Sequence, residues 1–413
     1  MNKHKIHPAW GILAACILIQ AGTIGIMNNC MGLFYPSICE ELGIRMGDIS
    51  IFSTIMQLVM AVSIPYTVLL LKKKNMKYYL AAALLICSFC FGVKGWFTSL
   101  YQLYIVGAVM GVAGSIAYGS AISVLINNWF QDKKALAFGI VFSASGVFGA
   151  IFNPICSRLI LTLGWRNASW VMAGICAILT LPVVFLIIKR VPEEKGVQAY
   201  GAERISEAGT VERVQKQVSI SKPVLVLGCC MAVNFIVCWV SQYLGHLVTF
   251  AESLGASLLV GSAISTCSMV GNVLSKVGLG ALGDKKGYKI TVFTGVLMTA
   301  GGFYFFLFGG AQTLTLYAGG FLYGGAAAMA SVIPSTIATS LYANNNYEKN
   351  LGKMQAMGYL GSSVAFTVIG YSYDIFGSYV PSFWMALVLL AAVLVLVNVI
   401  ASHTKITTVQ TVA

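Results

Sequence analysis

Charge is scarce in this sequence. Only 9% of its 413 residues are Asp, Glu, Lys or Arg, whereas 58% are hydrophobic. A soluble globular protein of this length needs far more charged surface, so that class is excluded. A lipid bilayer, by contrast, favours apolar helices whose backbone groups are satisfied internally. The composition therefore predicts an all-α membrane protein.

Acidic residues and histidines are scarcer still, with 13 Asp and Glu and 4 His dispersed along the chain. An integral membrane enzyme needs these residues clustered, and no such cluster is visible. No G-x-x-x-x-G-K-[ST] loop for ATP occurs. A membrane sensor needs a folded soluble domain, and the charged segment 189–222 is too short for one. We expect no cofactor and no metal, and an enzyme or sensor is the weakest alternative.

Long apolar runs fill most of the chain. A helix needs about 20 apolar residues to cross the ~30 Å hydrocarbon core. That rule predicts 12 transmembrane helices, over residues 9–34, 48–71, 78–97, 101–128, 135–162, 168–188, 223–250, 257–282, 290–308, 313–341, 353–376 and 380–402.

The polar segment divides these helices into two groups of six. The predicted domains are a six-helix bundle at 1–188, a linker at 189–222, a second six-helix bundle at 223–402 and a tail at 403–413.

Lysine and arginine are distributed unevenly between the two sides of the membrane. Of the 26, 21 lie in the leader, the linker, the tail and the loops on the same side as them. The positive-inside rule therefore predicts a cell-membrane protein with both termini in the cytoplasm. The basic residues form no stripe with interleaved aromatics, so nucleic acid is not an expected partner. The basic leader 1–10 is interpreted as the start of an uncleaved first span.

Two cations, Lys94 and Arg158, are expected to reach the outer interface by snorkelling. Lys276 differs, because it lies ~12 Å of helix before Asp284, near the middle of a span. A lysine there costs about 2.5–3.5 kcal/mol on insertion scales and needs a partner or a wet cavity. No acid lies within one helical turn in the sequence. An anionic substrate could complete the pair, and a structural ion pair is the alternative.

The segment GALGDKKGYK, Gly280 to Lys289, resembles the loop motif G-x-L-x-D-[RK]-x-G-[RK]-[RK] of the major facilitator superfamily. The resemblance implies two bundles that rock about a midplane site. It also implies gating by Gly280, Asp284, Lys285 and Gly287, with a plain interfacial role for Asp284 as the alternative. The matching loop of the first half, Leu70 to Tyr79, keeps only the positive charge, so this gating is expected only in the second half.

A longer stretch, Asn127 to Val171, resembles the monocarboxylate transporter and oxalate/formate antiporter group. The matching residues are Trp129, Phe130, Lys133, Lys134, Gly139 and Gly164-Trp165-Arg166. In that group an arginine before the loop acid binds the substrate carboxylate, and Lys276 occupies the matching position. The first-span lysine of proton-coupled members is Asn29 here, and the eleventh span has no second basic residue. The resemblance thus implies a monoanion rather than a dicarboxylate.

In this fold the first, fourth, seventh and tenth spans line the transport path. Their polar and amphipathic side chains are further candidates for substrate binding: Gln20, Asn28, Asn29, Tyr118, Asn234, Gln242, His246 and Tyr323. Lipid would penalise each of them. Hydrogen bonding between helices explains each equally well. His246 could also titrate near neutral pH and carry coupling.

The sequence therefore predicts a secondary active transporter that moves a small organic anion, a monocarboxylate, across the cell membrane by alternating access. Its expected partners are the lipid bilayer and that substrate, and the sequence leaves open a coupling ion or a counter-substrate. The alternative is a major facilitator exporter of amphipathic drugs or metabolites. Proton-driven exporters need an acid in the cavity, and none is predicted in mid-span.

Overall fold

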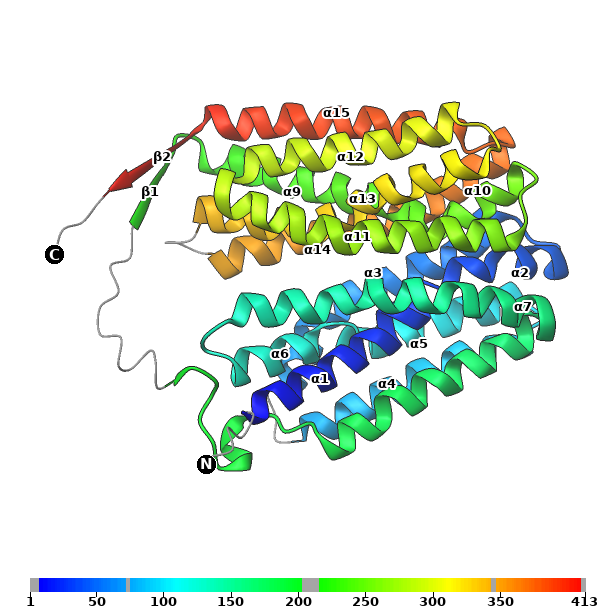
Figure 1. Cartoon of the computed structure of the whole chain (residues 1–413), viewed down its shortest axis with the longest axis horizontal. Coiled ribbons are helices and arrows are strands. Elements are labelled where there is room, and N and C mark those ends of the chain that lie inside the picture. Colours follow the sequence, from blue (N-terminus) through cyan, green and yellow to red (C-terminus); the bar gives the residue numbers. More distant parts are fainter. Residues whose placement is uncertain (1–6, 72–74, 203–214, 343–346, 410–413) are drawn as a thin grey trace. The chain divides into compact units, whose positions relative to one another are not determined.

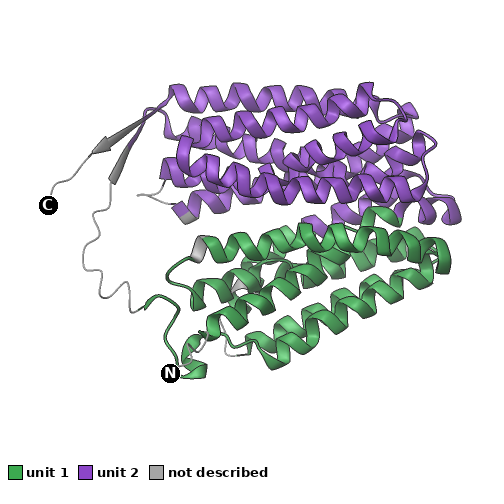
Figure 2. Ribbon diagram, in the orientation of Figure 1, with its two compact units in different colours: residues 1–34, 59–211 green, residues 35–58, 212–413 purple. Residues whose placement is uncertain are grey.

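The computed structural model describes residues 7–71, 75–202, 215–342 and 347–409 (Figure 1). The chain forms two compact helical units (Figure 2). Unit 1 comprises Met1–Phe34 and Val59–Val211, and unit 2 comprises Tyr35–Leu58 and Glu212–Ala413. The boundary between Leu58 and Val59 falls inside one helix, so that helix contributes to both units.

Unit 1 is built almost entirely of helices. Its elements are α1 (Pro8–Gln20), the π-helix η1 (Ala21–Asn28), the 3₁₀ helix η2 (Met31–Leu33), the second half of α3 (Met46–Leu71), α4 (Met76–Val93), η3 (Lys94–Trp96), α5 (Leu100–Ala117), α6 (Ser120–Trp129), α7 (Lys134–Leu186) and η4 (Pro192–Lys195). α7 packs against α1, η1 and α4.

Unit 2 holds the remaining elements. They are α2 (Tyr35–Leu42), the first half of α3, β1 (Gln215–Ile220), α9 (Pro223–Val240), η5 (Ser241–His246), α10 (Leu247–Ser253), α11 (Leu258–Lys286), α12 (Tyr288–Phe308), α13 (Thr313–Tyr342), α14 (Tyr347–Phe376), α15 (Val380–Ser402) and β2 (Thr404–Val409).

The predicted twelve-span architecture is confirmed. Ten helical stretches of the described chain are long and apolar enough to cross a membrane. One of them, within α7, holds two spans, because Gly164 (φ 75°, ψ 156°) interrupts it with a non-helical conformation that suits glycine. α14 supplies the twelfth crossing with 30 residues, although it is less apolar than the others.

Several predicted spans are not single α-helices, and the seventh, 223–250, continues from α9 through the 3₁₀ helix η5 into α10. The first consists of α1, a π-helical segment and a 3₁₀ turn, and the fourth is divided into α5 and α6 around Gly119. The wider turns of η1 pack closely against α7. A Cβ on Gly25 would meet Phe148 and the backbone of Ser145, which both belong to α7. Hydropathy measures only apolar length, so it does not detect these changes of helix type.

A small sheet was not predicted at all. The end of the linker and the tail pair as antiparallel strands β1 and β2, with Val218 opposite Ile406. Both segments carry β-branched residues, among them Val218, Ile220 and Ile406, which favour strands. The linker also contacts unit 1, because Tyr200 donates its backbone N–H to the Trp129 carbonyl at 2.9 Å.

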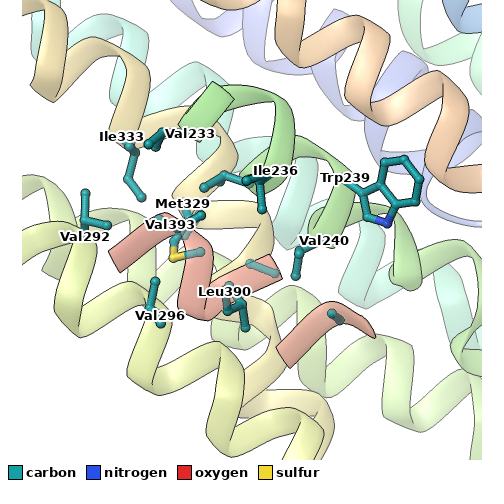
Figure 3. Packing of buried hydrophobic residues seen from close by; sticks show 14 of the residues in the cluster. Val233, Ile236, Trp239, Val240, Val292, Val296, Met329, Ile333, Leu390 and Val393 are labelled. Carbon is teal, nitrogen blue, oxygen red and sulfur yellow. The ribbon is translucent and has the colours of Figure 1, made fainter. Parts of the chain in front are cut away.

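One hydrophobic core joins the helices of unit 2, among them α9, α12, α13 and α15 (Figure 3). Figure 3 shows residues of this core from each of these helices: Val233 and Ile236 of α9, Val292 and Val296 of α12, Met329 and Ile333 of α13, and Leu390 and Val393 of α15. The same core includes Ile264 and Leu279 of α11, and α11 also packs against α12 and α13.

Glycine allows α11 and α13 to approach closely. A Cβ on Gly324 would collide with the Ser268 carbonyl oxygen and the Asn272 backbone nitrogen, neither of which can rotate away. Small residues permit such backbone contacts between membrane helices.

Substituting Gly324→Ala should therefore destabilise the protein. Overpacking of this kind costs about 1–3 kcal/mol, and thermal unfolding of the purified protein should show a lower midpoint. Gly278→Ala on α11 is the matched control, because a Cβ there meets nothing within 4 Å. Equal midpoints for the two variants would show that this helix contact is not limiting.

Candidate functional site

Lys276 lies inside α11, ~15 Å of helix before its C-terminal residue. The side chain is half-buried. Lys276 is therefore neither at a helix end nor on a fully exposed surface, in keeping with its predicted mid-span depth.

A polar face on α11 leads to Lys276. Five of its residues are buried: Ser262, Ser265, Ser268, Asn272 and Ser275. Within the described chain, Ser262 Oγ, Ser268 Oγ and Asn272 Oδ1 have no hydrogen-bond partner. Buried polar atoms are usually paired, and exceptions point to a ligand or water.

Asn272 was not among the predicted site residues, although a signal for it existed. It precedes Lys276 by four residues, so the two side chains share one face of α11. An amide acceptor beside an ammonium suits a ligand that carries both an anionic group and a hydrogen-bond donor.

Tyr323 of α13 is fully buried, and its hydroxyl is engaged with η5. The hydroxyl oxygen lies 2.9 Å from the carbonyl oxygens of Val240 and Ser241, and it accepts a hydrogen bond from Leu244 N at 3.0 Å. These contacts support the helix-to-helix alternative for Tyr323 rather than direct substrate contact.

Tyr323→Phe tests that structural role. The variant removes the hydroxyl, so buried backbone groups at η5 lose their hydrogen-bond partner. The free energy of unfolding should fall by about 1–3 kcal/mol. We expect a lower unfolding midpoint than for wild type. Tyr304→Phe is the control, because Tyr304 is exposed and its hydroxyl makes no bond with the described chain. A normal midpoint for Tyr323→Phe would remove the hydroxyl from the structural account.

The other predicted residues of unit 2 are also bonded within it. Gln242 donates to Ser362 Oγ of α14 at 2.9 Å, and Asn234 donates to the Met354 carbonyl at 2.6 Å. His246 is buried with Nδ1 3.5 Å from the Tyr379 hydroxyl, and its Nε2 has no partner in the described chain. Tyr323, Gln242 and His246 thus gather around η5.

The candidates in unit 1 differ in burial. Gln20 is buried at the end of α1, and its Oε1 has no partner in the described chain. Asn29 donates to the Ser145 carbonyl at 3.0 Å, whereas Asn28 is exposed. Tyr118 caps the end of α5 and is buried.

The prediction that Lys94 snorkels is wrong. Lys94 is only 1% exposed, and its ammonium lies 3.6 Å and 3.7 Å from the ring centroids of Phe91 and Phe34. Helical rise places a residue along the membrane normal but gives no information on which neighbours enclose it. Arg158 is exposed, as snorkelling requires.

A family model described as Major Facilitator Superfamily matches residues 17–250 and 227–409, which together cover most of the chain. The chain belongs to the major facilitator superfamily. It is therefore a multi-pass membrane protein of a family of transporters rather than enzymes.

Individual relatives agree with this membership. Monocarboxylate transporter 12 of Mus musculus is 22% identical over 300 residues, covering 68% of this chain and 61% of the mouse protein's length. Sialic acid transporter NanX of Escherichia coli is 24% identical over 215 residues, covering 52% of this chain and 50% of that protein.

Solved structures show the same fold. The nucleoside transporter NupG has a TM-score of 0.69 at 15% identity, with 96% of this chain and 99% of that chain covered. A bacterial homologue of the human lysosomal transporter Spinster, in an inward-facing and occupied conformation, has a TM-score of 0.67 at 11% identity, with 97% of each chain covered.

The superfamily motif lies at the end of α11. Gly280, Asp284 and Lys285 lie in its last turns, and Gly287 (φ 76°) ends the helix before α12 begins at Tyr288. Asp284 and Lys285 are exposed. Asp284 makes no hydrogen bond or ion pair within the described chain, so the gating role stays a prediction.

A polar contact of this superfamily member was missed by sequence analysis. Asp374 of α14 accepts hydrogen bonds from Met46 N at 3.1 Å and Gly47 N at 2.6 Å, which are the first residues of α3. Carboxylates at helix N-termini are stabilising. Deeper along α3, the Thr54 hydroxyl lies 2.7 Å from that of Thr367. All these residues belong to unit 2.

Proposed function

We propose that this chain is a secondary active transporter that carries a small organic monocarboxylate across the cell membrane by alternating access. One observation supports the substrate class most directly. A lysine is half-buried within a membrane-spanning helix, at Lys276 of α11. Holding such a cation there is costly unless the site serves charged ligands or is wet.

The surroundings of Lys276 favour a polar anion. Asn272, one helical turn before Lys276, has an acceptor oxygen without a hydrogen-bond partner in the described chain. The same holds for the hydroxyl of Ser268, one turn before Asn272. The ammonium would neutralise the carboxylate, and the amide oxygen would accept a hydrogen bond from a hydroxyl or amine of the same substrate. The relatives named as monocarboxylate and sialic acid transporters support an acidic substrate.

Charge number supports a monoanion over a dicarboxylate. The resemblance matches Asn29 to the first-span lysine of proton-coupled monocarboxylate carriers. In this chain the Asn29 side chain carries no charge and donates a hydrogen bond to the Ser145 carbonyl. One ammonium on α11 matches one carboxylate. The remaining parts of the proposal are cytoplasmic termini, supported by the uneven distribution of Lys and Arg, and gating at Gly280, Asp284, Lys285 and Gly287.

Uptake by proteoliposomes tests the substrate class. Labelled short monocarboxylic acids should enter vesicles that hold the protein, whereas the corresponding neutral amides and the dicarboxylates should not. Vesicles without protein are the control. Equal uptake of an acid and its amide would contradict the proposal, because a site built around an ammonium must distinguish them.

A further inference from the structure

Lys94 lies in an almost wholly apolar setting, with only 1% of its surface exposed. The ammonium lies between the rings of Phe34 and Phe91, and Met31 Sδ is 3.2 Å from it. The thiols of Cys30 and Cys156 lie close enough to interact with it electrostatically. No carboxylate lies within 4 Å of Lys94 in the described chain.

These neighbours do not balance the charge. Desolvating an ion costs several kcal/mol in proteins, whereas a desolvated cation–π contact returns about 2 kcal/mol or more. Thioethers and thiols are only weak acceptors. A charged lysine therefore needs an anion that the described residues do not supply.

A second unsatisfied group points to the same place. Asn153 of α7 is fully buried, and neither its amide nitrogen nor its amide oxygen has a hydrogen-bond partner in the described chain. It lies three residues before Cys156, so both side chains are on one face of α7, and Cys156 neighbours Lys94. The amide N–H₂ of Asn153 and the ammonium of Lys94 are thus two buried donors in one region of unit 1.

We infer that Lys94 and Asn153 bind a small monovalent anion inside unit 1, with Phe34, Phe91 and Met31 enclosing the cation. The shared chemistry is one negative charge that accepts two hydrogen bonds, which a halide or the carboxylate of a short acid provides. This site is separate from Lys276 and does not depend on the proposed substrate.

Thermal unfolding of the purified full chain tests the site. Protein in sulfate buffer, whose anion is neither monovalent nor a carboxylate, is titrated with chloride or with acetate, because an anion bound only by the folded state raises the unfolding midpoint. The variants are Lys94→Met, which suits the apolar cage, and Asn153→Leu, which keeps the lysine. Arg158→Gln is the matched control, since Arg158 is an exposed cation on the same helix as Asn153. Lys276→Met separates the two sites.

The expected result is a saturable rise in the wild-type midpoint that is absent in Lys94→Met and intact in Arg158→Gln. In Asn153→Leu the apparent affinity should fall about tenfold, the loss of one charge-assisted hydrogen bond. A response to chloride identifies a halide site. A response to acetate that survives Lys276→Met identifies a carboxylate site.

Two results would overturn the inference. One is a wild-type midpoint that neither anion raises, which would indicate a neutral amine without a ligand. The other is an unchanged response in Asn153→Leu, which decides the question even where Lys94→Met does not fold.

Discussion

Uptake of a monocarboxylate by proteoliposomes should fall at least about 100-fold when Lys276 is replaced by methionine. Removing one partner of a desolvated ion pair costs about 3–5 kcal/mol, because the other charge is left uncompensated. In Lys276→Met the uncompensated charge is the carboxylate of the substrate. We therefore expect transport to be lost while the protein still folds. Methionine preserves the length and the apolar stem of the lysine.

Two further variants make this result specific. Lys276→Arg keeps the positive charge and should retain part of the uptake, although a planar guanidinium differs in geometry from an ammonium. Lys222→Met removes an exposed lysine before α9 and should leave uptake unchanged. Wild-type uptake by Lys276→Met, with normal expression and folding, would exclude Lys276 from the mechanism.

A disulfide between α3 and α14 should stop transport reversibly. The hydroxyls of Thr54 and Thr367 are 2.7 Å apart, so cysteines at both positions lie within reach of a disulfide. α3 belongs to unit 2 up to Leu58 and to unit 1 from Val59. A motion between the units must therefore bend α3 or separate its first half from α14. Oxidation prevents the separation of α3 from α14, and it should lower uptake below about a tenth of the reduced rate, because we expect alternating access to use that separation.

The chain's own 11 cysteines require controls. Each single variant, Thr54→Cys and Thr367→Cys, is oxidised under the same conditions and should keep its uptake. A reductant should restore uptake in the double variant. Full transport by completely crosslinked protein would show that the first half of α3 stays with α14 throughout the cycle.

The helical architecture was predictable because the bilayer imposes a simple length rule. Apolar runs of sufficient length gave the twelve spans, and Gly164 was correctly placed between the fifth and sixth. The π-helical η1 was missed, since its wide turns depend on packing against α7 rather than on its own composition. The β1–β2 pairing was missed for a similar reason, because it joins segments far apart in the sequence.

The candidate site was only partly predictable. The helical position of Lys276 follows from counting residues, and Asn272 could have been found from the spacing of four. Contacts between residues far apart in the sequence could not be predicted from the sequence. Lys94 meets Phe34 from another helix, and Asp374 caps a helix that begins 328 residues earlier. Neither partner has a local signal.

The central claim is that the charge of Lys276 pairs with the substrate's carboxylate, and equilibrium binding measures this most directly. A transported acid and its neutral amide are titrated into purified wild-type protein and into Lys276→Met. The account predicts that wild type prefers the acid about 100-fold or more and that the variant binds both equally weakly. A variant that still prefers the acid as strongly as wild type does would contradict it.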